Sequence, residues 1–203
     1  MKPTLDPTKT TFAVALYGGS FDPVHRAHIE VARAVLREVD VEQVVFLPAA
    51  RSPLKGSSVQ ADAASRLQMV HLATEGGRGF SVDDRELRRG GTSYTIDTVR
   101  AYAAEQPEVG LYWIIGGDQL ELLPRWHAIE ELARLVCFVV LQRPDYATRA
   151  PEIPGLRYLE VEAPLMEHSS TEIRERIAAG EPVGDWLPRS VEAFIYEHGL
   201  YTR

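Results

Sequence analysis

Two histidines, His25 and His28, lie three residues apart directly after a glycine-containing turn. On a helix this spacing puts both imidazoles on one face near the N-terminal end. A helix N-terminus favours anions, and imidazole N–H groups can donate hydrogen bonds to phosphate oxygens. We therefore predict that the pair contacts phosphate. The alternatives are two surface histidines after a plain turn, or a zinc site, for which Cys137, the single cysteine, offers no cysteine pair.

The turn before the histidines reads Gly-Gly-Ser-Phe-Asp-Pro at residues 18–23. It has neither the glycine spacing of a dinucleotide-binding fingerprint nor the Gly-Lys-Ser/Thr of a P-loop. Gly18 and Gly19 follow a predicted strand and let the backbone approach a ligand closely. Asp22 and Pro23 are predicted to open a turn or a helix, with Asp22 as the cap and Pro23 at the first helical position.

A second candidate anion site lies at residues 168–174, where the sequence is His-Ser-Ser-Thr-Glu-Ile-Arg. Ser169 and Glu172 form a predicted capping box, and Gly180 ends the helix that it opens. Hydroxyl groups, free backbone N–H groups and Arg174 then meet in the first helical turn. An arginine opposes the helix dipole there, which indicates a role other than helix stability. The alternative is an ordinary capped helix with a solvated arginine.

Three further segments combine glycines, hydroxyl groups and aromatic rings. Residues 91–98 open a helix with clustered hydroxyl groups, and residues 113–120 form a strand that breaks at glycines and delivers Asp118 to its carboxyl end. Trp126 follows closely, between Arg125 and His127. This polar context favours a half-exposed stacking surface, and a place in the core is the alternative.

The elements that must position these residues alternate along the chain. Strand patterns cover residues 12–17, 44–47, 80–82, 111–115, 136–141 and 157–161, and helical patterns cover 24–39, 61–74, 94–104 and 129–134. Strands that are apolar throughout and alternate with helices indicate a parallel sheet covered on both faces. We therefore expect a Rossmann-like, doubly wound α/β fold in one domain at residues 12–203, after an irregular lead-in at 1–11. In such folds ligands bind outside the carboxyl ends of the strands.

Composition narrows the function classes. The chain has 203 residues and a formal net charge of −7. This balance argues against a nucleic acid polymer, which needs a field of Lys and Arg, but allows a small anion held by a few local cations. The longest apolar run, residues 136–141, is too short to cross a membrane, and the N-terminus lacks the apolar core of a signal peptide. We expect a cytoplasmic protein with no obligate protein partner.

The motifs, in this order, resemble those of the nucleotidylyltransferase superfamily. Residues 18–28 are similar to its first signature, which ends His-x-Gly-His, and residues 168–174 to its Ile-Ser-Ser-Thr-x-Ile-Arg. The segments at 93–98, 114–120 and Trp126 resemble the bacterial nicotinate-nucleotide adenylyltransferase family in particular. Three positions depart from the pattern: Ala27 replaces a glycine, Leu54 a histidine, and His168 a hydrophobic residue.

The resemblance implies transfer of the adenylyl group of ATP to nicotinate mononucleotide, giving deamido-NAD and pyrophosphate in NAD biosynthesis. It implies these catalytic residues: His25, His28, Lys55 and Arg174. It implies these ATP-binding residues: Gly18, Gly19, Ser20, Phe21, Gly116, Asp118, Arg143, Ser170 and Thr171. It implies these residues around the nicotinate nucleotide: Tyr94, Thr95 and Trp126. Mg²⁺ is expected on the ATP phosphates, with no metal site built from protein ligands.

Other hypotheses remain. The acceptor could be nicotinamide mononucleotide or phosphopantetheine, since a single ring substituent separates the first of these from nicotinate mononucleotide. A non-catalytic nucleotide-binding module belongs to a different class, although it has no need of His25, His28 and Arg174 together. A zinc-dependent hydrolase would need a third ligand beyond the two histidines.

Overall fold

The computed structural model describes residues 12–53, 59–142, 149–162 and 168–202. Three predicted features lie outside the described residues: the lead-in at 1–11, Lys55 with its neighbour Leu54, and Arg143.

Six parallel strands form one sheet in the order β3-β2-β1-β4-β5-β6. This is the strand order of a doubly wound, Rossmann-like fold, so the predicted fold class is confirmed. All six predicted strands are present. Their bounds are β1 (Phe12–Gly19), β2 (Gln43–Pro48), β3 (Phe80–Val82), β4 (Val109–Gly116), β5 (Val136–Gln142) and β6 (Tyr158–Glu162). Four of them, β1, β2, β4 and β5, are one to three residues longer than predicted, and β6 is shifted by one residue.

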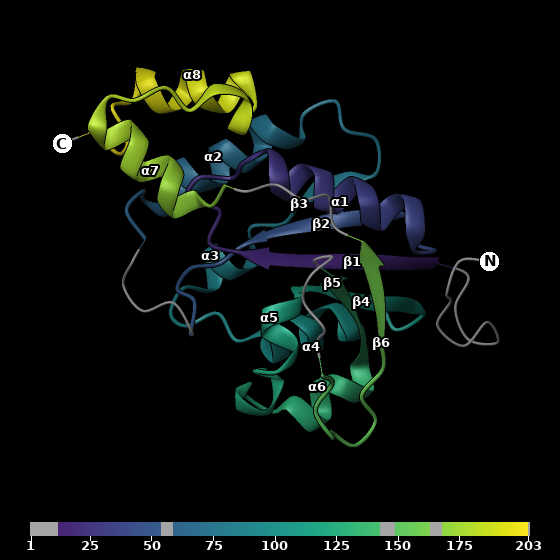
Figure 1. The fold of residues 1–203 in the computed structure, drawn as a ribbon. Coiled ribbons are helices and arrows are strands. Elements are labelled where there is room, and N and C mark those ends of the chain that lie inside the picture. The colour runs from purple at the N-terminus through teal and green to yellow at the C-terminus, as the bar shows by residue number, and fades with distance from the viewer. Residues whose placement is uncertain (1–11, 54–58, 143–148, 163–167, 203) are drawn as a thin grey trace.

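Helices cover both faces of the sheet (Figure 1). One face carries α1 (Arg26–Glu38), α2 (Ala63–Thr74), α7 (Ser170–Ala179) and α8 (Arg189–Glu197). The other carries α4 (Thr95–Glu105) and α6 (Ile129–Leu135). Short helices fill connections: α3 (Arg85–Arg89), α5 (Gly117–Leu120), η1 (Leu123–Arg125) and η2 (Gly184–Trp186). The helices α3 and α8 are not among the predicted elements.

The two faces of the sheet contribute to two separate cores, because neighbouring residues of a strand point to opposite sides. In β1, Ala15 packs with α1, α2, α7 and α8, whereas Val14 and Leu16 pack with α4 and α6. Both sides are therefore apolar, which explains why the strands read as continuous apolar runs rather than as alternating patterns.

The strand order reverses between β1 and β4, and this is where doubly wound folds bind ligands. Pairing of the two strands ends at Leu16 and Trp113, although the strands continue to Gly19 and Gly116. The carboxyl ends of β1 and β4 therefore separate, and the chain segments that follow them carry the predicted motifs.

Candidate active site

The histidine pair lies at the start of α1. His25 is the N-cap residue and His28 follows at the third helical position, so the helix starts two residues later than predicted. The ring centroids are 3.8 Å apart, and His28 Nδ1 accepts a hydrogen bond from the backbone N–H of His25 at 3.2 Å. Because Nδ1 accepts, the proton of a neutral His28 ring sits on Nε2. The predicted shared face is confirmed, and the Nε2–H group lies across the His28 ring from the atom that accepts from His25.

Asp22 and Pro23 form a turn, as predicted, but Asp22 does not cap α1, and that prediction is wrong. Its carboxylate is buried and accepts hydrogen bonds from the backbone N–H groups of Gln60 (2.8 Å) and Ala61 (3.0 Å). It also accepts one from the hydroxyl of Tyr201 at 2.8 Å. These partners lie far along the chain, so no local spacing could have revealed them.

The second signature meets the first at this turn. Ser169 caps α7 by accepting the N–H of Glu172 at 3.2 Å, which confirms that half of the predicted capping box. Ser170 then donates to the carbonyl oxygen of Pro23 at 3.0 Å. Arg174 Nη1 donates to the carbonyl oxygen of Asp22 at 2.8 Å, and lies 3.8 Å from its Oδ2. Arg174 is thus held in place rather than solvated.

Part of the Arg174 guanidinium remains available. Its Nη2 donates to Thr171 Oγ1 at 3.3 Å, while Nε is buried and has no hydrogen-bond partner among the described residues. An unpaired buried N–H costs free energy, so this group calls for an acceptor. A phosphate oxygen would be one.

The two glycines after β1 are required by close neighbours. A Cβ atom on Gly18 would lie 2.8 Å from Cζ2 of Trp113, and one on Gly19 would lie 2.9 Å from Cζ of Phe21. Phe21 in turn packs edge-to-face on His28, with ring centroids 5.1 Å apart. Gly18 therefore allows Trp113 to pack against the loop, and Gly19 allows Phe21 to pack against both the loop and the ring of His28. Trp113 is a residue that the sequence did not single out.

Asp118 lies where the sequence predicts, at the carboxyl end of β4 and in the first turn of α5. Its carboxylate is exposed and accepts from the side-chain amide of Gln119 at 3.0 Å. Gly116 leaves room for it, because a Cβ atom there would lie 2.5 Å from Asp118 Oδ1. The carboxylate is therefore free to meet a ligand at this edge of the sheet.

Tyr94 and the segment around Trp126 also come together. Tyr94 precedes α4, is 38% exposed, and stacks at a tilt on His127, with centroids 4.8 Å apart. Trp126 is half-buried and packs against Phe138, and its buried Nε1 has no partner among the described residues. Thr95 begins α4 next to Tyr94. The sequence gives no role to His127, although its ring contacts Tyr94.

A buried network that the sequence did not reveal supports Tyr94. Ser93 Oγ accepts from the N–H of Ala50 at 2.9 Å, and Thr98 donates to the buried carboxylate of Glu86 at 2.6 Å. Burial raises the pKa of Glu86, although hydrogen bonds from Thr98 and Ser93 oppose the shift. The segment before α4 is therefore fixed to the loop after β2.

His168, which departs from the family pattern, is buried beside the histidine pair. Its ring stacks flat on Trp186, with centroids 5.1 Å apart, and meets His25 edge-to-face at 5.3 Å. Burial lowers the pKa of His168, while Glu172 acts in the opposite direction. The ring therefore replaces an apolar side chain as a packed, predominantly neutral wall of the site.

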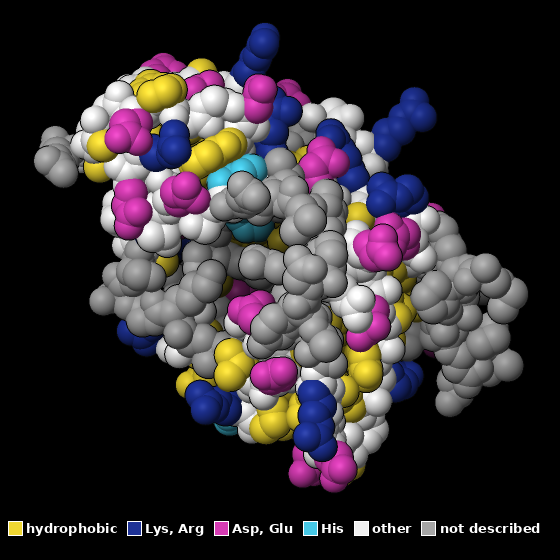
Figure 2. Space-filling view, viewed as in Figure 1, with side chains coloured by type: hydrophobic (Ala, Val, Ile, Leu, Met, Phe, Trp, Pro, Cys, Tyr) yellow, Lys and Arg dark blue, Asp and Glu magenta, His cyan; other side chains and the backbone are white. Residues whose placement is uncertain are grey.

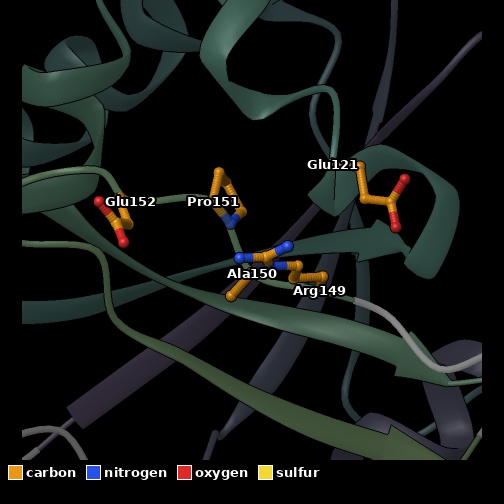
Figure 3. Close-up of a pocket in the computed structure, with 5 residues that line it drawn as sticks. All are labelled: Glu121, Arg149, Ala150, Pro151 and Glu152. Atoms are coloured by element: carbon orange, nitrogen blue, oxygen red, sulfur yellow. The ribbon is translucent and has the colours of Figure 1, made fainter.

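The charges of the described residues on the face of the molecule in Figure 2 do not form a continuous basic patch, as expected when a few local cations hold a small anion. Figure 2 shows acidic and basic side chains interspersed, with histidine side chains reaching the surface beside α7. A separate open pocket of about 430 Å³ is lined by Glu121 and, opposite it, by Arg149, Ala150, Pro151 and Glu152 (Figure 3). None of the predicted site residues lines this pocket, so it lies outside the site described above.

Two features of the described residues bear on other functions. They contain no cluster of three or more His, Cys, Asp or Glu side chains arranged to hold a metal ion. They also contain no helix with both the length and the apolar character needed to span a membrane. The zinc hypothesis therefore finds no third ligand in the part of the chain that is described.

Comparisons with known proteins agree with this geometry. A family model described as cytidylyltransferase-like matches residues 16–176. A protein of Opitutus terrae named "Probable nicotinate-nucleotide adenylyltransferase" is 41% identical over 189 residues, covering 93% of this chain and 97% of that protein. A protein of the same name from Listeria monocytogenes is 40% identical over 190 residues, covering 94% and 97%.

Solved structures share the fold. The nicotinic acid mononucleotide adenylyltransferase of Plasmodium falciparum, complexed with NaAD, aligns with a TM-score of 0.75 at 18% identity, covering 94% of this chain and 97% of that one. The same protein complexed with APC aligns with a TM-score of 0.72.

Fold, site and family model together define a nucleotidyltransferase of the cytidylyltransferase-like class. Within this class the relatives decide the assignment, because they are about 40% identical to this chain over more than nine-tenths of both lengths. The chain belongs to the nicotinate-nucleotide adenylyltransferase family.

Proposed function

We propose that this site holds the triphosphate of ATP between its two signatures and transfers the adenylyl group to nicotinate mononucleotide, with release of pyrophosphate. The observation that carries the proposal is the meeting of both signatures on one turn. Ser170 and Arg174 bind the carbonyl oxygens of Pro23 and Asp22, and His25 and His28 follow directly. Donors from opposite ends of the chain thereby converge beside the switch point of the sheet.

The chemistry needs no general base. The attacking group is a phosphate monoester, whose second pKa is about 6, so it is already an anion at neutral pH. The difficulty is to align two anions that repel each other and to stabilise the charge that develops at the α-phosphorus. In this proposal the N–H and cationic groups of the site perform both tasks.

Each donor has a place in this scheme. His28 offers its Nε2–H and is the group nearest the α-phosphate, while Arg174 offers the buried Nε that has no partner among the described residues. Ser170 and Thr171 lie in the first turn of α7, whose backbone N–H groups favour the outer phosphates. Gly18 and Gly19 allow the backbone to approach them.

The remaining predicted residues stay proposals. Asp118 and Gly116 would contact the nucleotide at the carboxyl end of β4. Lys55 and Arg143, outside the described residues, would add positive charge at the phosphates and the adenosine. Ser20 and Phe21 complete the ATP loop.

The nicotinate ring would stack between Tyr94 and Trp126. Tyr94 contacts the ring of His127, which directly follows Trp126 in the chain. The Nε1–H of Trp126, which has no partner within the described part of the chain, would donate to the ring carboxylate and so favour nicotinate over nicotinamide.

Mg²⁺ would enter as part of the MgATP substrate. The groups that surround the turn are imidazoles, hydroxyls and a guanidinium, whereas Mg²⁺ prefers carboxylate and water oxygens. The carboxylate of Asp22 is already occupied by three hydrogen-bond donors. Phosphate oxygens and water are therefore the expected ligands, and a cytoplasmic location remains a prediction of the sequence.

The test is an assay of pyrophosphate release with ATP, Mg²⁺ and one of three acceptors: nicotinate mononucleotide, nicotinamide mononucleotide or phosphopantetheine. We expect fast release with the first and slow or no release with the others. No release with nicotinate mononucleotide would refute the proposal, and equal rates with the two mononucleotides would refute the role given to Trp126.

A further inference from the structure

One buried carboxylate connects four parts of the chain that are far apart in sequence. Asp22, only 3% exposed, accepts hydrogen bonds from the segment before α2 through Gln60 and Ala61, and from Tyr201 near the C-terminus. It also faces Arg174 on α7. The sequence assigns no function to this meeting point, and no family motif identified in the chain includes Tyr201.

The hydroxyl of Tyr201 donates a hydrogen bond to Asp22. Its ring is packed in the core beside α8, and burial, together with the neighbouring carboxylate of Asp22, raises the pKa of the phenol far above its ordinary value. The hydroxyl therefore stays protonated at neutral pH. The 2.8 Å bond to Asp22 Oδ1 is consequently a permanent O–H donation to a charged acceptor, which is the stronger type of hydrogen bond.

The backbone at Tyr201 is held in this position against its own preference. Its φ of +64° lies in the left-handed region, which a bulky residue seldom adopts. The turn before it is closed by the N–H of Leu200, which donates to the carbonyl oxygen of Ile195 at 2.9 Å. Tertiary contacts therefore fix the end of the chain against the first loop.

The other side of Asp22 bears on the phosphate site. Arg174 Nη1 donates to its main-chain carbonyl oxygen at 2.8 Å and lies 3.8 Å from its carboxylate. A displacement of Asp22 would move both acceptors and, with them, the guanidinium. Among the described residues Tyr201 makes no hydrogen bond with Arg174, so the hydrogen-bonded connection between them runs through Asp22.

We propose that Tyr201 is a positioning residue for the phosphate site: it holds Asp22, and through Asp22 it holds Arg174 in the place where ATP binds. This inference rests on the proposed function, in which Arg174 binds the ATP phosphates. The end of the chain thereby contributes to catalysis without touching the substrate.

The first experiment compares Tyr201→Phe with Tyr196→Phe. Both changes remove one hydroxyl, but Tyr196 lies on α8 with 52% of its surface exposed and serves as the matched control. We expect the KM for ATP to rise about 3- to 10-fold in Tyr201→Phe, because one hydrogen bond contributes on that scale. The KM for nicotinate mononucleotide should not change, and neither constant should change in Tyr196→Phe. An unaltered KM for ATP would overturn the inference.

A double-mutant cycle separates positioning from a general structural effect. Dissociation constants for ATP are measured by calorimetry for the parent, Tyr201→Phe, Arg174→Ala and the double variant. If Tyr201 acts through Arg174, its substitution adds nothing once Arg174 is absent. A full additional loss in the double variant would show that Tyr201 acts by another route and would overturn the inference.

A measurement on the unmodified protein covers the case in which Tyr201→Phe does not fold. Coupling is reciprocal, so ATP must stabilise the contact that helps to bind it. Hydrogen exchange at the amide of Leu200 should therefore slow when ATP is added, and should not slow with nicotinate mononucleotide alone. No protection by ATP would contradict the coupling. An inactive wild-type protein would instead mean that the proposed function itself has failed.

Discussion

Replacing His28 removes two separate functions, and the structure allows them to be measured apart. The Nδ1 atom accepts the backbone N–H of His25 and so stabilises the start of α1, while Nε2–H is the proposed donor to the α-phosphate. Loss of a capping acceptor costs about 1 kcal/mol of stability. Loss of a donor aimed at charge in the transition state lowers kcat by about 10²- to 10³-fold. His28→Ala should show both effects.

Two further variants divide these effects. In asparagine the side-chain oxygen is as many bonds from Cα as Nδ1 is in histidine, so His28→Asn should keep the capping bond and recover stability. In glutamine the amide nitrogen is as many bonds from Cα as Nε2, so His28→Gln should recover part of kcat. Stability is read from urea unfolding, and kcat from pyrophosphate release at saturating substrates.

A comparison of these variants tests whether Nδ1 and Nε2 of His28 have separate roles. We expect His28→Asn to be nearly as stable as the parent and nearly as inactive as His28→Ala. If His28→Asn turned over within a few-fold of the parent, Nε2 would have no part in the chemistry. If all three variants lost stability and activity in proportion, the histidine would be a structural cap only.

Three other predictions concern packing and burial in the protein. Gly18→Ala brings a methyl group to 2.8 Å from the ring of Trp113. Because overpacking destabilises a core, the free energy of unfolding measured in urea should fall by about 1–3 kcal/mol. An unchanged midpoint of urea unfolding would contradict this close contact. Burial raises the pKa of Glu86 above its ordinary 4.5. Its native state therefore binds the proton more tightly, and its contribution to stability is lost as pH rises from 4.5 through the native pKa. Glu86→Gln should gain stability relative to the parent as pH rises through this window, and a constant difference would show that Glu86 does not titrate there. Burial also raises the pKa of Cys137 to about 11, so a thiol reagent at neutral pH should label it only after unfolding; rapid labelling of the native protein would contradict its burial.

The fold was predictable because it depends on local patterns. Strands covered on both sides must be apolar throughout, and the runs at β1, β2, β4 and β5 show this directly. The edge strand β6 and the short β3 were also found, although β6 carries exposed residues. The helix α8 is not predicted, although it has an apolar stripe. Val191 and Ile195 on this stripe are buried in the core.

The site was predictable only where its contacts are local. The spacing of His25 and His28 and the cap at Ser169 operate within one helical turn, so the sequence reveals them. Asp22 was mistaken for such a local cap because an Asp-Pro pair before a helix commonly is one. Its real partners are more distant, and spacing carries no information about contacts across the fold.

The same distant contacts resolve an apparent conflict between an acidic chain and an anionic substrate. Asp22 faces Arg174. Burial lowers the pKa of Arg66, and the charge of Asp22 opposes this shift. A negative charge therefore lies within the proposed phosphate site. It weakens the attraction for ATP, but it restricts a guanidinium whose free side chain would carry about 2 kcal/mol of rotamer entropy. Arg66 donates to the carbonyl oxygen of Ser20 at 2.7 Å and fixes the loop in the same manner. The carboxylate of Asp22 thus lowers the net positive charge of the proposed phosphate site but holds its donors in position before ATP binds. Where two anions must be aligned, the position of the donors matters more than the net charge.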